Sequence, residues 1–282
     1  MIRAAVLGQD VSRSRSPQIH NAAYAALGIK GKYEAVSVSG KDFRKAIRAL
    51  VKDGYNYVNV TIPHKKLAAR IATRRSAAVD MTGAANTLVF RRKAGAVEIT
   101  ADNTDGQGLL AALGDLGVAV KRGTRFVMVG AGGAAAGALL ALVKKGAHVV
   151  ILARRVAPAR ALRNRLPENL RKRVEVASLN SETLAIHLPN TDVLISAIPA
   201  AAWEDAALLQ GLSALTKAAA VVEMAYGTTS PLATAARRRT PRYQDGLPML
   251  VHQAAYAVKL AIKATPPVDE MLRAARSTPL QK

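Results

Sequence analysis

Polar residues that could bind and convert a small anion cluster where predicted strands end in the first half of the chain. The segment 12–17 places three serines directly before a predicted helix, where hydroxyls and early backbone amides can hold a carboxylate. The segment 59–66 alternates polar side chains before Lys65, and the segment 103–106 contributes Asp105. A lysine and an aspartate among asparagines, threonines and serines are typical of a site for a polyhydroxylated anion.

A second group of residues is typical of dinucleotide binding. The segment 127–135, Val-Met-Val-Gly-Ala-Gly-Gly-Ala-Ala, fits the pattern G-x-G-x-x-[GA] between a predicted strand and a predicted helix. Glycines let backbone amides approach a pyrophosphate, although such a turn can also serve packing alone. After the next strand, where an NAD-binding chain carries an acid, this chain has Arg154 and Arg155. Two guanidinium groups favour the 2′-phosphate of NADP, unless they only begin a basic helical face.

The elements that must position these residues alternate between strand and helix along the whole chain, which predicts the α/β class with mostly parallel sheets. In the first half we expect strands at 4–7, 33–38 and 57–62, helices at 17–27, 41–52 and 104–116, and a hairpin of 86–90 with 97–101. A second series begins at residue 125, with strands at 126–129, 148–152, 174–177, 193–198 and 220–224. Two alanine-rich helices, 249–263 and 268–276, could pack on either domain.

The composition excludes several classes of protein. A chain of 282 residues that is 50% apolar and 21% charged can bury one large core or two small ones, so it is not disordered. The absence of cysteine excludes disulfides and thiolate sites, and the five histidines lack paired ligand spacing, so we expect no metal. The uncharged run 126–143 contains four glycines and fits a strand, a turn and a helix better than a membrane span. We expect an unexported, cytoplasmic protein.

The formal net charge of +22 suggests an anionic partner such as nucleic acid, a membrane surface or an acidic small molecule. The basic residues are spread along the chain without interleaved aromatic residues, which favours a solvated basic surface. A basic nucleic-acid-binding protein with a vestigial dehydrogenase fold is the alternative from another class.

Several motifs in order resemble the shikimate dehydrogenase family. The family's S-x-S-P, N-V-T-x-P-x-K, G-A-x-N-T, N-T-D-x-x-G and G-A-G-G-A blocks match residues 14–17, 59–65, 83–87, 103–108 and 130–134. The segments 224–226 and 246–255 resemble its last two blocks. The resemblance implies reversible, NADPH-dependent reduction of 3-dehydroshikimate to shikimate on the route to chorismate and the aromatic amino acids. Quinate/shikimate and aminoshikimate dehydrogenases share this scaffold and stay open as alternatives.

The resemblance implies a role for each matching residue. It makes Lys65 and Asp105 the catalytic pair, in which Lys65 would be a proton donor or a substrate-binding cation only. It implies that the substrate is bound by Ser14, Ser16, Asn59, Thr61, Asn86, Tyr226 and Gln253. The two serines would bind the carboxylate of the substrate, and the other residues would surround its ring hydroxyls. We expect NADP to be bound by Gly130, Ala131, Gly132, Gly133, Ala134, Arg154, Arg155, Met224, Gly246 and Met249. Arg155 is included because of its charge and not because of a match to the family's motif.

The resemblance also implies two domains. An α/β substrate domain, 1–104 with 246–282, would be closed by the C-terminal helices, and a Rossmann-type NADP-binding domain, 105–245, would be inserted between its parts. The partner would be the small-molecule substrate, without nucleic acid or membrane, and the protein a monomer or a homodimer. Positions that depart from the family's pattern, all but the last on the cofactor side, include Ser196, Ile198, Glu223, Pro248 and Arg13.

Overall fold

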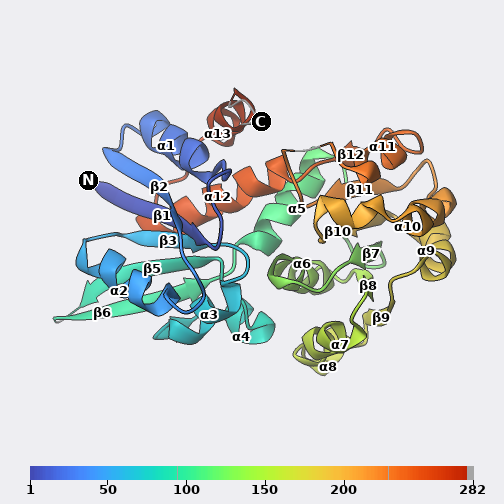
Figure 1. Ribbon diagram of the computed structural model, residues 1–282, viewed down its shortest axis with the longest axis horizontal. Helices are drawn as coiled ribbons and strands as arrows, with labels where there is room; N and C mark the ends of the chain where they lie inside the picture. The colour runs from blue at the N-terminus through green and yellow to red at the C-terminus, as the bar shows by residue number, and fades with distance from the viewer. Residues whose placement is uncertain (94, 228, 278–282) are drawn as a thin grey trace. The chain divides into compact units, whose positions relative to one another are not determined.

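The chain divides into two compact units in a computed structural model that describes residues 1–93, 95–227 and 229–277 (Figure 1). The first unit comprises Met1–Gly108 and Leu250–Lys282, and the second comprises Leu109–Met249. Both boundaries fall within helices, α5 (Asp105–Asp115) and α12 (Leu247–Ile262), a few residues after the expected boundaries at 104 and 246. Residues 278–282, the end of the expected substrate domain, lie outside the described residues.

The first unit is built on a six-stranded sheet in the order β2-β1-β3-β5-β6-β4. Its strands are β1 (Ile2–Gly8), β2 (Gly31–Ser37), β3 (Tyr57–Val60), β4 (Arg74–Arg75), β5 (Thr87–Lys93) and β6 (Ala96–Asp102). Strand β1 pairs in parallel with β2 and β3, whereas β5 is antiparallel to both β3 and β6. The hairpin predicted from the sequence is therefore confirmed, and this sheet is mixed rather than parallel throughout.

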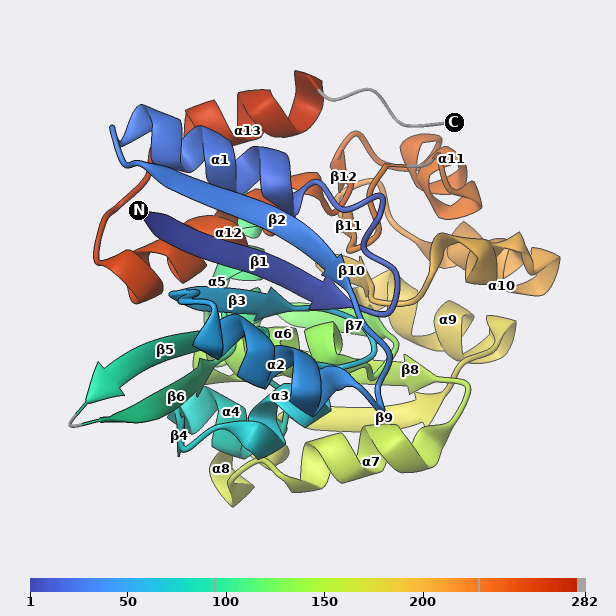
Figure 2. The same cartoon turned by 60° about the vertical axis from the view of Figure 1, so that its left-hand side comes forward.

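Helices pack on this sheet through apolar side chains at helical spacing. On α2 (Phe43–Lys52), Phe43, Ile47 and Leu50 are buried in one cluster with Val58 and Leu88 of the sheet. The remaining helices of the unit, besides the parts of α5 and α12, are α1 (Ser16–Ala26), α3 (Lys65–Ile71), α4 (Ala77–Thr82) and α13 (Val268–Ser277). Both ribbon views place α13 alongside α1 (Figures 1 and 2), so the C-terminal helix packs on the first unit.

The second unit is a parallel six-stranded sheet in the order β12-β11-β10-β7-β8-β9. Its strands are β7 (Arg125–Val129), β8 (His148–Ala153), β9 (Val174–Ser178), β10 (Val193–Ser196), β11 (Ala220–Glu223) and β12 (Tyr243–Gln244). Numbered from β7, the strands run 3-2-1-4-5-6 across the sheet, which is the Rossmann order. The strand order reverses between β7 and β10, and nucleotides bind at such a point in this class of fold.

The connections of the second unit are mostly helical. Its helices are α6 (Gly133–Lys144), α7 (Val156–Asn164), α8 (Glu168–Arg171), α9 (Ser181–His187), α10 (Ala206–Gly211) and α11 (Pro231–Arg237), with short 3₁₀ helices at Leu188–Asn190, Ala200–Glu204 and Leu212–Ala214. The uncharged run 126–143 is β7, a glycine turn and α6, as expected. Among the described residues, none of the helices combines the length and apolar character needed to cross a membrane. The predicted α/β class, with a Rossmann-type sheet, is confirmed.

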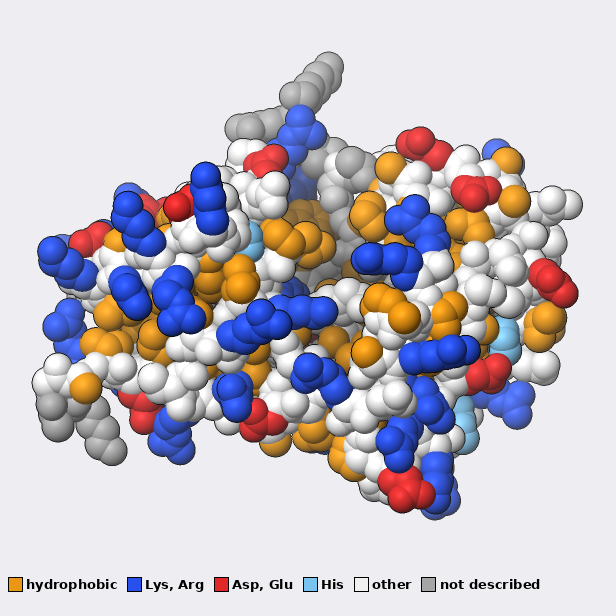
Figure 3. Space-filling model, turned by 60° about the horizontal axis from the view of Figure 1, so that its bottom comes forward, with side chains coloured by type: hydrophobic (Ala, Val, Ile, Leu, Met, Phe, Trp, Pro, Cys, Tyr) orange, Lys and Arg blue, Asp and Glu red, His pale blue; other side chains and the backbone are white. Residues whose placement is uncertain are grey.

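Basic side chains are distributed widely over the surface. Arg44, Lys45 and Arg48 of α2 are all exposed. The face drawn in Figure 3 shows lysine and arginine side chains mixed with uncharged and acidic ones. This distribution is consistent with a solvated basic surface.

Four polar rings are buried together in the first unit. The His20 ring stacks on Tyr33 with centroids 3.9 Å apart, and its Nδ1 lies 2.8 Å from the Tyr57 hydroxyl. That hydroxyl in turn lies 2.6 Å from the Tyr24 hydroxyl. Burial away from water disfavours the charged imidazolium and lowers the pKa of His20 from 6.5 to about 3.

This burial predicts that the first unit loses stability as the pH falls. The unfolded chain takes up a proton at His20 near pH 6.5, whereas the folded chain resists protonation down to about pH 3, so the free energy of unfolding decreases through this window. The expected loss is ~2 kcal/mol between pH 7 and pH 5. The tyrosines around the ring do not titrate there. Urea unfolding of the wild type and His20→Gln at both pH values measures the effect, and parallel pH dependences would contradict it.

Candidate active site

A buried ion pair lies at the start of two helices of the first unit. Lys65 is the first residue of α3 and Asp105 the first of α5, and Lys65 Nζ lies 2.5 Å from Asp105 Oδ2. Only 9% of Lys65 and 4% of Asp105 are exposed. The amino end of α5 favours a carboxylate, because the helix dipole is positive there. A buried ammonium beside a buried carboxylate can hold a proton at a fixed point, which is what acid–base chemistry at an oxygen requires.

Backbone contacts on both sides of Lys65 fix its position. His64 is buried, and its Nε2 lies 2.7 Å from the Val38 carbonyl oxygen. The His64 ring also packs against Phe43, with centroids 5.1 Å apart. The backbone amide of Ala85 donates to the Lys65 carbonyl oxygen over 2.9 Å. The turn before α3 is therefore anchored to the end of β2 and to the segment before β5.

Amide side chains surround Asp105. Asn86 Nδ2 lies 2.9 Å from Asp105 Oδ1 and 3.0 Å from Gln253 Oε1. The Thr104 backbone amide donates to Asn86 Oδ1 over 2.8 Å. Gln253 comes from α12, near the other end of the chain, and its own Nε2 donates to the Leu250 carbonyl oxygen. The structure therefore brings together four of the residues singled out in the sequence, Lys65, Asp105, Asn86 and Gln253.

The other expected substrate ligands of the first unit lie on β3 and before α1. Asn59 donates to the Asn86 carbonyl oxygen over 3.2 Å, and Thr61 follows β3 and is half-buried. Ser16 is the first residue of α1 and is buried, and its backbone amide lies 3.3 Å from Ser14 Oγ. Two hydroxyls at a helix amino end are suited to a carboxylate. Direct contact of these four side chains with a substrate stays a prediction.

The glycine turn of the second unit leaves backbone amides accessible at the start of α6. Gly130 follows β7 with φ of 108°, and a Cβ there would lie 2.8 Å from Ile198 Cγ2 and 2.9 Å from the Ala197 carbonyl oxygen. No residue with a side chain fits that position. Gly132 caps α6 without a side chain, and the space around it is open. The first amides of α6, from Gly133 and Ala134 on, are therefore available to a pyrophosphate.

Basic side chains follow the neighbouring strand. Arg154 and Arg155 come directly after β8, and both are exposed. The carboxyl ends of β7 and β8 meet at one edge of the parallel sheet, so the arginines and the glycine turn share that edge. Ala131 lies within the glycine turn, between Gly130 and Gly132. Backbone amides at a helix amino end and exposed guanidinium groups are the donor set that suits NADP.

The remaining expected cofactor residues follow β11 and begin α12. A Cβ on Gly246 would lie 2.2 Å from the Met224 carbonyl oxygen, so the chain passes over Met224 where only glycine fits. Met249, in the first turn of α12, is buried. Tyr226 is half-buried two residues after Met224 and belongs to the second unit, unlike the other six expected substrate ligands.

The contacts of Glu223 show how one departure from the family pattern fits the fold. This carboxylate is buried at the end of β11, and its Oε2 accepts hydrogen bonds from Ser230 Oγ over 2.6 Å and from the Tyr243 hydroxyl over 2.9 Å. Ser230 caps α11 and Tyr243 belongs to β12. The longer glutamate side chain therefore ties together the elements that precede and follow the Met224 segment.

Gly246→Ala is expected to destabilise the second unit by about 1–3 kcal/mol, the usual cost of forcing extra atoms into a packed site. The new methyl group would overlap the Met224 backbone. Urea unfolding and NADP⁺ titration check the result. Gly114→Ala is the matched control, because nothing lies within 4 Å of the added Cβ on this exposed helical residue. Equal stability of the two variants would contradict the prediction.

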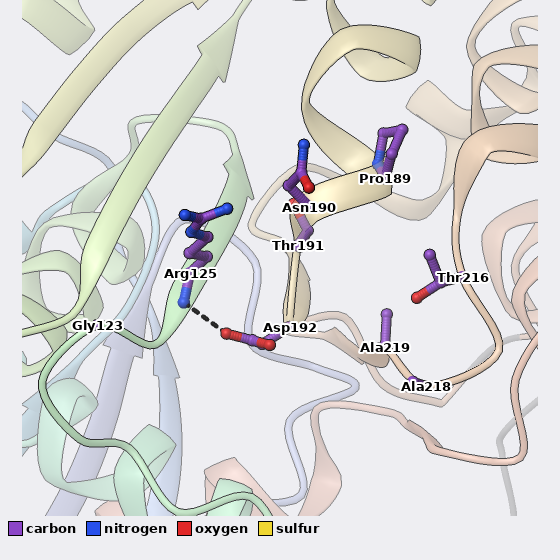
Figure 4. A pocket seen from close by; sticks show the side chains of 9 residues that line it. All are labelled: Gly123, Arg125, Pro189, Asn190, Thr191, Asp192, Thr216, Ala218 and Ala219. Carbon is purple, nitrogen blue, oxygen red and sulfur yellow. Dashed lines mark hydrogen bonds between the residues drawn. The ribbon is translucent and has the colours of Figure 1, made fainter.

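A separate pocket of about 310 Å³ lies at the opposite edge of the Rossmann sheet (Figure 4). Arg125 and Asp192 line it at the amino ends of β7 and β10, where the Arg125 backbone amide donates to Asp192 Oδ2 over 2.8 Å. Ligands of parallel α/β sheets bind at the carboxyl ends of the strands. This pocket is therefore not part of the expected cofactor site.

Some contributors to the site were not singled out in the sequence. His64 and Thr87 fall inside matched motifs without a role of their own, and Tyr33 donates to Asn59 Oδ1 from β2, outside every motif. Their sequence neighbours do not mark them, because Tyr33 stands between Lys32 and Glu34 and Thr87 follows Asn86. Which partner each side chain meets depends on strand pairing.

A Rossmann-order sheet with this glycine turn, in a chain that also buries a lysine–aspartate pair, is typical of dehydrogenases that use a nicotinamide nucleotide. Residues 6–88 match the family model for the shikimate dehydrogenase substrate binding domain, and residues 117–231 match that for shikimate/quinate 5-dehydrogenase. The chain belongs to the shikimate dehydrogenase family.

Curated relatives match the chain over nearly its whole length. The shikimate dehydrogenase (NADP⁺) of Methanocella arvoryzae is 35% identical over 273 residues, which are 96% of this chain and 97% of the relative. The enzyme of the same name from Dinoroseobacter shibae is 36% identical over 276 residues, 96% of each chain. The recognition of the family from its motifs is thereby confirmed.

Solved structures show the same fold. A crystal structure of shikimate 5-dehydrogenase from Thermus thermophilus in complex with NADP(H) and shikimate has a TM-score of 0.84 and 28% identity, and the match covers 98% of this chain and 99% of that chain. The shikimate dehydrogenase of Mycobacterium tuberculosis has a TM-score of 0.80 and 31% identity over 98% of this chain and 99% of its own.

Proposed function

We propose that this protein is an NADP-dependent shikimate dehydrogenase that catalyses the reversible reduction of 3-dehydroshikimate to shikimate. The observation that carries the proposal is the buried Lys65–Asp105 pair with Asn86 and Gln253 against it. Charge and amide groups of this kind match a ring that bears a ketone and hydroxyls. The names of the relatives agree with this assignment.

Lys65 acts on the oxygen at C3 of the ring. Its ammonium group has three hydrogens, of which one is directed at Asp105, so two remain for the substrate. In the reductive direction Lys65 polarises the carbonyl oxygen by a hydrogen bond and then protonates it. Asp105 keeps the ammonium group oriented. NADPH, when bound, supplies the hydride.

The substrate is held by the groups around this pair. Ser14 and Ser16 bind its carboxylate at the amino end of α1. The amides of Asn86 and Gln253 bind ring hydroxyls by exchanging part of their present mutual hydrogen bond. A ring that lacks the hydroxyls would leave buried amides unpaired, which is how such a site discriminates.

The cofactor is held by the second unit. The amides at the start of α6 bind the pyrophosphate, and Gly130 allows the close approach. Arg154 and Arg155 bind the 2′-phosphate, which makes NADP rather than NAD the cofactor.

The decay of NADPH absorbance with purified protein and 3-dehydroshikimate tests the proposal. Turnover with NADPH that greatly exceeds turnover with NADH supports it. No turnover with 3-dehydroshikimate would overturn it. Shikimate and quinate, compared as substrates for NADP⁺ reduction, separate the family's two activities. A cytoplasmic location and a monomeric or dimeric state stay predictions from the sequence.

A further inference from the structure

A buried hydroxyl at the start of β5 links two asparagine side chains. Thr87 is fully buried, and its Oγ1 lies 3.0 Å from Asn59 Nδ2 and 3.0 Å from Asn86 Oδ1. An amide nitrogen only donates and an amide oxygen only accepts. The Thr87 hydroxyl therefore accepts a hydrogen bond from Asn59 Nδ2 and donates its only hydrogen to Asn86 Oδ1. These two partners fix the orientation of the hydroxyl.

The orientation of Asn59 is itself fixed. Asn59 Nδ2 also donates to the Asn86 backbone carbonyl oxygen over 3.2 Å, so a flipped amide would place two oxygens against each other. The Oδ1 atom of Asn59 consequently faces Tyr33, whose hydroxyl donates to it over 2.8 Å. The Tyr33 ring is held by its stack on His20. A directed chain of hydrogen bonds thus runs from β2 to β3 and on to β5.

The chain of hydrogen bonds ends at the catalytic pair. Asn86 Oδ1 receives both the Thr87 hydroxyl and the Thr104 backbone amide, and these two donors turn Nδ2 toward Asp105 Oδ1 and Gln253 Oε1. In the reversed amide, an oxygen would face two other oxygens and two donors would lose their acceptor.

We propose that Thr87 is a positioning residue: its hydroxyl, oriented through Asn59, keeps the Asn86 amide directed at Asp105. The inference rests on the proposed function, because it assigns Asp105 to the reaction. Substrate hydroxyls compete for Asn86 Nδ2 during turnover, and the Thr87 hydrogen bond resists rotation of the amide at that stage. Because the Thr104 backbone amide also holds Asn86, we expect the fold to persist without this bond.

Two substitutions at one position test the proposal. Thr87→Val keeps the shape of the side chain and removes the hydroxyl, whereas Thr87→Ser retains the hydroxyl. We expect Thr87→Val to lower kcat by about 3–10-fold, the rate equivalent of one neutral hydrogen bond, with the KM for NADPH unchanged. Thr87→Ser should restore kcat to within about twofold of the wild type.

Thr240→Val is the matched control. Thr240 is also buried, and its hydroxyl likewise donates to a carbonyl oxygen, that of Ala219, and accepts from a backbone amide, that of Arg242. It belongs to the second unit and is not among the residues to which a role in substrate binding, cofactor binding or proton transfer is assigned. We expect Thr240→Val to lower the unfolding midpoint and leave kcat per folded molecule unchanged.

The outcomes separate the two levels of inference. Equal kcat values for Thr87→Val and the wild type would overturn the positioning role and leave the proposed function intact. A fall in kcat that Thr87→Ser shares, or that matches the loss of folded protein in a urea titration, would also overturn it. No turnover of 3-dehydroshikimate by the wild type would overturn the proposed function and the positioning role with it.

Discussion

Lys65→Ala is expected to lower kcat for 3-dehydroshikimate reduction by ~10²–10⁴-fold, the usual contribution of a positioned proton donor. The ammonium group lies 2.5 Å from Asp105 and is almost completely buried, so neither water nor a neighbouring side chain can take its place without rearrangement. The KM should change much less, because the interaction with the oxygen strengthens as charge develops there.

The control for this substitution is Lys66→Ala, which removes the exposed lysine next in sequence. It should leave kcat within about twofold of the wild type. Lys65→Ala also leaves Asp105 as a buried charge without its partner, which is destabilising. Urea unfolding measured in parallel, and rates expressed per folded molecule, separate that cost from lost chemistry. If the KM rose while kcat stayed constant, Lys65 would be a binding cation and the acid–base role would be wrong.

Much of the fold could be predicted because its elements are long and regularly patterned. The uncharged stretch around Gly130 reads as strand, turn and helix, and that is how it folds. Strands β4 and β12 could not be predicted, because each has two residues and neither is buried enough to impose alternation. Their strand character comes from pairing with β6 and β11.

The site is only partly readable from the sequence for a related reason. Lys65 and Asp105 are polar residues where strands end, and strand ends meet in an α/β sheet, so their proximity follows from the fold class. The direction of each side chain does not follow from it. Thr87 and His64 acquire roles only through partners from other parts of the chain, Asn59 of β3 and Val38 directly after β2.

Two glycines of the matched motifs have structural reasons that the motifs alone do not reveal. Gly246 was assigned to the cofactor from its motif, and the structure adds a packing reason, because a Cβ there would collide with the Met224 backbone. Gly130 has both reasons at once, a positive φ and the close approach of Ala197. A glycine in a motif can therefore be required by its neighbours before any ligand is considered.

The second large effect is expected on NADP⁺ binding, from the arginine at the sheet edge where we propose that the nucleotide binds. Arg154 stands after β8, where an acid would bind the ribose hydroxyls of NAD and repel a phosphate. Because its side chain is exposed, the arginine gives up little of its hydration until a phosphate arrives. A charge-assisted, bidentate contact with the 2′-phosphate is then formed only by NADP.

Arg154→Ala is expected to weaken NADP⁺ binding by roughly 1.5–3 kcal/mol, or about 10–150-fold in Kd, and to leave NAD⁺ binding nearly unchanged. Titration of both nucleotides against the wild type and the variant, at fixed salt, measures the difference directly. Arg160→Ala removes an exposed arginine from α7, in the same unit, and controls for the loss of one positive charge. Its effect on NADP⁺ binding should be small, because salt screens the interaction between the nucleotide and an exposed charge that does not contact it. An equal loss for both nucleotides in Arg154→Ala would place this arginine away from the 2′-phosphate, and the basis of NADP selectivity would then have to lie in Arg155.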